Sequence, residues 1–138
     1  DQALRTAVEA SPYADSEAKF TELWEEVAGE QAMKERQRNQ LFNGKTLKSR
    51  ISAIRSMRNN TYHELVPELL KLVADASQPL ELRVNTAECL GWVGIPRRAE
   101  IIDACRQAAA DKNLEKELRD ELTQTAIRLE STVSVPTR

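Results

Sequence analysis

Apolar residues recur at intervals of three and four through the second half of this chain, which is the pattern of helices with one buried face. Four stretches show it: residues 62–76, 79–93, 97–110 and 114–130. Pro67 conflicts with a straight helix over the first stretch, so the pattern predicts a kink there or a true start near Val66. With no strand-like alternation, the pattern predicts an all-α fold.

The first half is less regular but still predicts helices. Thr46 is the expected N-cap of a helix over 46–58, and the preceding helix closes at residues 43–44, Asn-Gly. That earlier helix begins after Asp15 or Ser16 and is expected to break at Gly29, with Phe20, Leu23, Trp24 and Val27 on a core stripe. The predicted organisation is an N-terminal segment over 1–15 that can add a short helix, a repeat domain over 16–130, and a flexible tail over 131–138.

The helix pairs repeat one another. A shift of 36 positions places Asp75 on Asp111, Leu82 on Leu118 and Arg83 on Arg119, while the apolar stripes also superpose. A more diverged copy lies upstream, where a shift of 33 places Arg50 at the position of Arg83. Identical charged residues at one fixed offset indicate an internal structural repeat.

On these residues, together with Ala87, Leu90, Gly91, Gly94 and Ala126, the segment 46–130 resembles HEAT repeats, closest to the short HEAT-like repeats of phycobilisome lyase subunits. The resemblance implies a right-handed α-α superhelix, or solenoid, of about three helix pairs, with the second helices (46–58, 79–93 and 114–130) on the concave side. It also implies that Asp75, Arg83, Asp111 and Arg119 are structural residues that link neighbouring repeats. Phe42, Ile127 and Glu130 depart from the repeat pattern, as terminal repeats do. Lyase activity does not follow from the resemblance, because function belongs to sites and not to folds.

Composition restricts the chemistry that the chain can support. Only 4% of residues are aromatic against 41% hydrophobic, so the core is expected to consist mostly of aliphatic side chains. Cys89 and Cys105 lie on apolar stripes and are expected to be small buried residues, and His63 is expected in a first helical turn. Without spacing typical of metal ligands, nucleophilic triads or phosphate loops, we expect no cofactor, no metal and no catalytic residues. No apolar run reaches the ~18 residues of a membrane span.

Charge is distributed unevenly, although the net charge is only −2. Residues 1–32 carry a net charge of −6 and residues 33–60 carry +7. This asymmetry indicates either a solvated basic face balanced in space by the acidic first helix or a surface that attracts an acidic partner. The basic stretch lacks interleaved aromatic residues, which argues against a dedicated nucleic-acid binder.

The sequence therefore predicts a non-catalytic module that mediates protein–protein interaction as a scaffold or adaptor. The candidate partner-binding residues are Lys48, Arg55 and Trp92; the first two are seven positions apart and should project from the same side of their helix. Trp92 lies beside the core stripe, where it either packs on the neighbouring repeat or anchors a partner. The alternatives are an accessory domain of a larger enzyme, or weak binding of anionic ligands or nucleic acid through residues 34–58.

Overall fold

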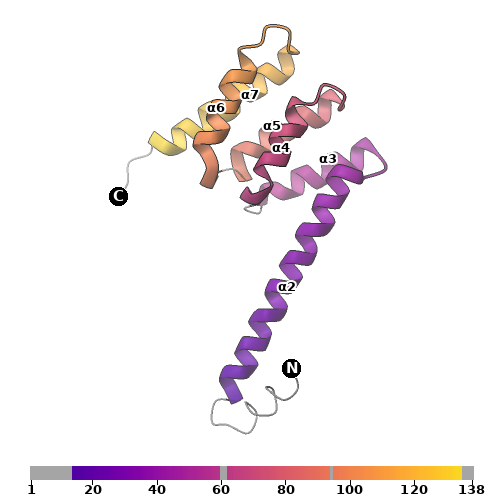
Figure 1. Ribbon diagram of the computed structural model, residues 1–138, viewed down its shortest axis with the longest axis vertical. Coiled ribbons are helices and arrows are strands. Elements are labelled where there is room, and N and C mark those ends of the chain that lie inside the picture. Colours follow the sequence, from indigo (N-terminus) through magenta and orange to yellow (C-terminus); the bar gives the residue numbers. More distant parts are fainter. Residues whose placement is uncertain (1–13, 60–61, 94, 135–138) are drawn as a thin grey trace. The chain divides into compact units, whose positions relative to one another are not determined.

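The structure is a computed structural model that describes residues 14–59, 62–93 and 95–134 (Figure 1). Every regular element in these ranges is helical, which confirms the all-α prediction. The elements in chain order are α2 (Ala14–Asn43), α3 (Leu47–Ser56), η1 (Met57–Asn59), η2 (His63–Leu65), α4 (Val66–Ala74), α5 (Leu80–Val93), η3 (Ile95–Arg97), α6 (Arg98–Ala109) and α7 (Lys116–Ser134). Two compact units are present, Asp1–Arg36 and Gln37–Arg138. The predicted repeat domain over 16–130 therefore spans parts of both units.

The described part of the first unit is the N-terminal portion of α2, and it corrects two predictions. The helix does not break at Gly29, because one glycine costs only about 1 kcal/mol relative to alanine in a helix interior. The predicted core stripe is also wrong, since Trp24 and the apolar residues around it are exposed. Periodicity defined the apolar face of α2 but could not show whether anything covers it.

The second unit includes the end of α2 and the turn into α3. Gly44 donates its N–H to the Gln40 carbonyl at 2.9 Å, and a Cβ at this position would collide with that same carbonyl oxygen. Thr46 then caps α3 by accepting from the Ser49 N–H at 3.1 Å, which confirms the predicted cap. The Arg50 Nε donates to the Leu41 carbonyl at 2.7 Å and ties α3 back to the end of α2.

The helix predicted over 62–76 is divided in two. A short 3-10 helix, η2, leads into α4, which starts at Val66 with Pro67 in its first turn. The prediction of a true start near Val66 is confirmed, because a proline lacks the N–H that an interior helical position needs but the first turn does not. Buried Leu69, Leu72 and Val73 then face the core.

The internal repeat reappears as two loops with the same hydrogen bonds. The loop before α5 has Asp75 Oδ1 accepting from the Ser77 N–H at 3.0 Å, and the loop before α7 has Asp111 Oδ1 accepting from the Asn113 N–H at 2.9 Å. In both loops the Asp carbonyl also accepts a backbone bond from the residue three positions on. The 36-residue offset in sequence is thus an offset between equivalent turns.

Within the second unit, α5 packs against α3 on one side and α7 on the other, while α4 packs against α5 and α6. Two buried bonds link this row of helices: Thr125 Oγ1 donates to the Ala87 carbonyl at 2.7 Å, and the Cys89 thiol donates to the Ile54 carbonyl at 3.4 Å. Figure 1 shows α6 and α7 running alongside each other. Because α5 contacts both α3 and α7, the outward side chains of these three helices lie on neighbouring parts of the surface.

Several predicted ends lie elsewhere or cannot be compared. α7 continues through Ser134, past the end at residue 130 that the apolar stripe predicted, and so occupies half of the proposed flexible tail. The short helix predicted within 1–15 falls on residues outside the described ranges, apart from positions 14 and 15, which belong to α2. None of the helices in the described ranges is both long enough and apolar enough to cross a membrane.

Candidate functional site

A groove of about 480 Å³ lies between α3 and α5 in the second unit. Its lining consists of Leu47, Lys48, Ile51, Ser52 and Arg55 from α3 and Glu81 from α5. The α3 residues are spaced at three and four positions, so they share one side of the helix. Lys48 and Arg55, which the sequence proposed as partner-binding residues, line this same groove.

The groove joins an apolar floor to a basic rim. Ile51 is buried and Leu47 is partly buried, whereas Lys48 and Arg55 are exposed. Within the described part of the chain, neither basic side chain forms an ion pair. Glu81 supplies the single carboxylate in the lining. The arrangement suits an apolar side chain accompanied by a carboxylate from a binding partner.

A side-chain amide fixes the orientation of Arg55. Its Nε donates to Asn85 Oδ1 at 3.1 Å, and the Asn85 amide nitrogen donates in turn to the Glu81 carbonyl at 2.8 Å. The acceptor of this Nε bond is a neutral amide and not a carboxylate, so it does not offset the positive charge of the guanidinium. The terminal N–H groups of Arg55 take no part in this bond. Arg55 is therefore held in place while it can still bind a carboxylate.

Trp92 lies three turns along α5 from Glu81, about 16 Å away at 1.5 Å per residue. Its side chain is 41% exposed and lies between two guanidinium groups, with the Arg58 and Arg128 carbons 5.2 and 5.0 Å from the ring centroid. Both distances are within the ~6 Å of a cation–π contact. An indole held by two such contacts loses little further side-chain freedom on binding.

Carboxylates lie near the two guanidinium groups that contact this tryptophan. Glu88 Oε1 lies 3.2 Å from Arg58 Nη1, which fixes one of the two guanidiniums. Burial raises the pKa of Glu121, the nearby Glu88 charge raises it further, and Arg128 opposes both effects. Charged groups of both signs from η1, α5 and α7 therefore lie near one exposed aromatic ring.

Gly91 makes room for one of these cations. A Cβ at this position would lie 2.6 Å from Arg128 Nη1 and 3.4 Å from its Cδ, so the arginine crosses α5 where the helix has no side chain. Sequence reasoning missed Arg58, Arg128 and Asn85 as site residues. The available signal was Gly91 in the last turn of α5, since a residue without a side chain allows another group to approach the helix closely.

The contacts of the four residues proposed to link repeats lie mainly within a single helix pair, and Arg83 also reaches Glu115 of the next pair. Arg83 is 4% exposed; its Nε donates to the Val73 carbonyl at 2.8 Å, and its Nη1 lies 3.9 Å from Glu115 Oε2 in the loop before α7. Arg119 donates from Nε to the Leu114 carbonyl at 3.0 Å. The Asp75 and Asp111 carboxylates accept hydrogen bonds inside their own loops. The hydrogen bonds from Ser77 lower the pKa of Asp75, and the nearby Arg83 charge lowers it to a smaller extent.

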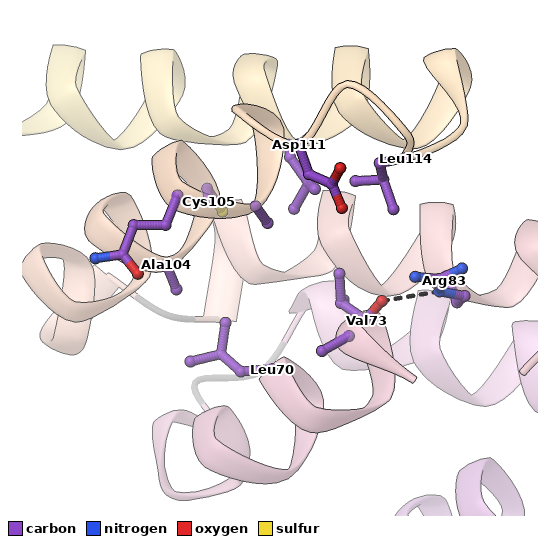
Figure 2. A pocket seen from close by; sticks show the side chains of 11 residues that line it. Leu70, Val73, Arg83, Ala104, Cys105, Asp111 and Leu114 are labelled. Atoms are coloured by element: carbon purple, nitrogen blue, oxygen red, sulfur yellow. Dashed lines mark hydrogen bonds between the residues drawn. The ribbon is translucent and has the colours of Figure 1, made fainter. Parts of the chain in front are cut away.

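Arg83 also lines a second cavity, of about 450 Å³, between the last two helix pairs. Figure 2 shows it with the bond from Arg83 to Val73 drawn, and with Leu70, Ala104 and Cys105 in the lining. Burial raises the pKa of the Cys105 thiol to about 11, and that of Cys89 to about 12. Neither thiol is therefore a ready nucleophile or metal ligand at neutral pH.

Both cysteines are free and buried, as their positions on apolar stripes predicted. His63 lies in η2, exposed, with its Nδ1 3.8 Å from Glu64 Oε2. Among the residues that the structure describes, no group of three or more histidine, cysteine or acidic side chains is arranged to hold a metal ion. Comparison of the chain with protein families, curated proteins and solved structures gives no match.

Proposed function

We propose that this chain is a non-catalytic helical-repeat module that binds a protein partner through the outward side chains of α3, α5 and α7. The observation that carries the proposal is the groove between α3 and α5, in which an apolar floor meets two basic residues that lack a carboxylate partner among the described residues. We call these lining residues, namely Leu47, Lys48, Ile51, Ser52, Arg55 and Glu81, the basic groove.

The proposal includes the assignment to HEAT-like repeats in a right-handed superhelix, with α3, α5 and α7 as the second helices of three pairs. It is supported by the equivalent Asp75 and Asp111 turns 36 residues apart, and by the side-by-side packing of α3, α5 and α7. Stacks of this kind present the outward residues of one helix row as a continuous binding surface.

Trp92 extends the same surface beyond the basic groove. Tryptophan and arginine dominate binding hot spots, and here a tryptophan lies between two arginines that hold it in one orientation. The Arg55–Asn85 and Arg58–Glu88 contacts connect α3 and η1 to α5 along the line between the basic groove and the ring. We propose that a partner segment of acidic and apolar character lies along this line.

Binding of nucleic acid through residues 34–58 is a weaker explanation of the same charges. Arg38 is paired with Glu68 at 2.7 Å and Arg58 with Glu88 at 3.2 Å, which reduces the positive potential available to a phosphate backbone. A partner with a few carboxylates needs only the remaining cations at the basic groove.

The test places a photo-crosslinking amino acid at Ser52, an exposed residue in the basic groove. Irradiation in the native cell should give a defined protein adduct, and Lys48→Glu with Arg55→Glu should remove it, because opposite charge at the rim controls encounter and register. A chain carrying the same crosslinker at Asp103, exposed on α6, is the matched control.

Identical adducts from Ser52 and Asp103, or adducts that survive the double charge reversal, would overturn the proposal. Circular dichroism of the reversed chain must remain helical, since exposed charges contribute little to folding. Lys71→Glu with Lys112→Glu makes the same charge change on other exposed sites and should leave the adducts intact.

A further inference from the structure

The first unit exposes an apolar stripe on α2. Phe20 is 66% exposed, Leu23 58%, Trp24 67% and Val27 46%. Their spacing of i, i+3, i+4 and i+7 places all four on one face of the helix over two turns. A contiguous exposed patch that includes phenylalanine and tryptophan marks an interaction site more often than isolated surface apolar residues do.

The flanks of this stripe are acidic. Residues 19–30 contain Glu22, Glu25, Glu26 and Glu30 against Lys19, a net charge of −3. Apolar anchors at i, i+3, i+4 and i+7 on an acidic helix fit a mode of recognition in which the helix lies in an apolar groove. The complementary surface should be an apolar groove with basic residues at its rim.

Pairing of two such stripes with each other is disfavoured. The apolar register lasts two turns, whereas a coiled coil needs at least about three heptads, and the continuing positions, Glu30 and Lys34, are charged. Two copies of the stripe would also bring glutamates against glutamates, and like charges in close contact oppose association. The stripe therefore needs a surface of opposite charge.

Every copy of this chain carries such a surface. The basic groove has Leu47 and Ile51 on its floor and Lys48 and Arg55 at its rim. Lys48 and Arg55 are seven residues apart, about 10 Å along a helix, and Phe20 and Val27 are separated by the same distance. The two surfaces match in length as well as in charge.

We propose that the apolar stripe of α2 in one copy docks in the basic groove of a second copy. The proposal rests on the proposed function of the basic groove and names its partner as this chain itself. Because stripe and groove are different surfaces, the contact is head-to-tail, and each copy in an assembly can use both. Association should therefore extend beyond a dimer as concentration rises.

The experiment measures the mass of the full chain in solution by sedimentation equilibrium over micromolar to millimolar concentrations. Wild type should show mass increasing with concentration. Phe20→Ala with Trp24→Ala, and separately Lys48→Glu with Arg55→Glu, should each weaken association by at least about tenfold, the loss expected when central anchors are removed. Ile95→Ala, at an exposed apolar residue of η3, should leave the mass profile unchanged.

Mixing the two variants gives the decisive result. The stripe variant keeps an intact groove and the groove variant keeps an intact stripe, so a 1:1 mixture should form a dimer of defined mass that cannot grow further. Self-association of the groove variant alone would show pairing between stripes and would overturn the proposal. So would a wild-type chain that stays monomeric at every concentration.

These failures are distinguishable from failure of the proposed function. A monomeric wild type whose Ser52 crosslinker still captures a different protein would refute the second copy as occupant but keep the basic groove as a binding site. Loss of both the self-association and the Ser52 adducts would remove both proposals.

Discussion

Removing Arg83 tests how α5 is held against α4. Its side chain is 4% exposed, and its Nε donates to the Val73 carbonyl at 2.8 Å, so Arg83→Ala leaves a buried acceptor without its charged donor. Loss of a hydrogen bond to a charged group costs about 1.5–3 kcal/mol. Burial of two methylenes of the stem adds about 1.5 kcal/mol at roughly 0.8 kcal/mol each.

Two effects limit the total loss of stability in Arg83→Ala. The Glu115 carboxylate lies 3.9 Å from Nη1 and its side chain is 51% exposed, so that ion pair contributes less than about 1 kcal/mol. The cavity beside Arg83 can also admit water to the Val73 carbonyl after the truncation. We therefore expect the free energy of unfolding to fall by about 2–4 kcal/mol.

The assay is urea denaturation followed by circular dichroism, where a loss of about 3 kcal/mol should move the midpoint by roughly 1–3 M. Arg83→Met keeps the apolar stem and isolates the lost donor, so its cost should be smaller than that of alanine. Arg119→Ala, which removes a bond from the repeat-related arginine to the Leu114 carbonyl at a partly buried site, should cost about 1 kcal/mol. A midpoint for Arg83→Ala equal to that of wild type would refute the reasoning.

Three further predictions concern the buried thiol of Cys89, the loop carboxylate of Asp75 and the close approach of Arg128 to Gly91 of α5. Burial raises the pKa of Cys89 from 9.0 to about 12, so the unfolded chain loses this proton first and stability should fall above pH 9; urea midpoints should decline less with pH in Cys89→Ala. Hydrogen bonds from Ser77 lower the pKa of Asp75, so this carboxylate contributes stability that is lost as pH drops below about 4, and Asp75→Ala should make the decline in acid titrations shallower. Gly91→Ala should change the free energy of unfolding by less than about 0.5 kcal/mol in urea, because a gain of about 1 kcal/mol in helix propensity offsets displacement of Arg128; a loss above 1 kcal/mol would mean that this arginine cannot move.

The second unit could be predicted largely from sequence because its signals are local. Thr46 caps α3 through its own hydroxyl, and Pro67 restricts where α4 can begin, so each residue fixes an end without help from distant contacts. The repeated Asp–Arg offset likewise reflects two loops with the same internal bonds. Such features depend on a few neighbouring residues, which periodicity and turn chemistry describe well.

The candidate site was less predictable because it depends on contacts between helices. The seven-residue spacing of Lys48 and Arg55 placed them on one side of α3. Their neighbours from α5 are distant in sequence, since Glu81 and Asn85 follow Arg55 by 26 and 30 residues. Arg128 reaches Trp92 only because α7 lies beside α5 at Gly91. A single sequence gives no register between helices, so these neighbours could not be identified.

Two of the basic side chains after residue 36 have carboxylate partners within the second unit itself. Arg38 pairs with Glu68 and Arg58 with Glu88. Lys48 and Arg55 have no carboxylate partner among the described residues, and both line the basic groove. The positive charges of Lys48 and Arg55 therefore lie beside the apolar floor of the basic groove. A docking surface for an acidic amphipathic helix requires this combination of basic and apolar side chains.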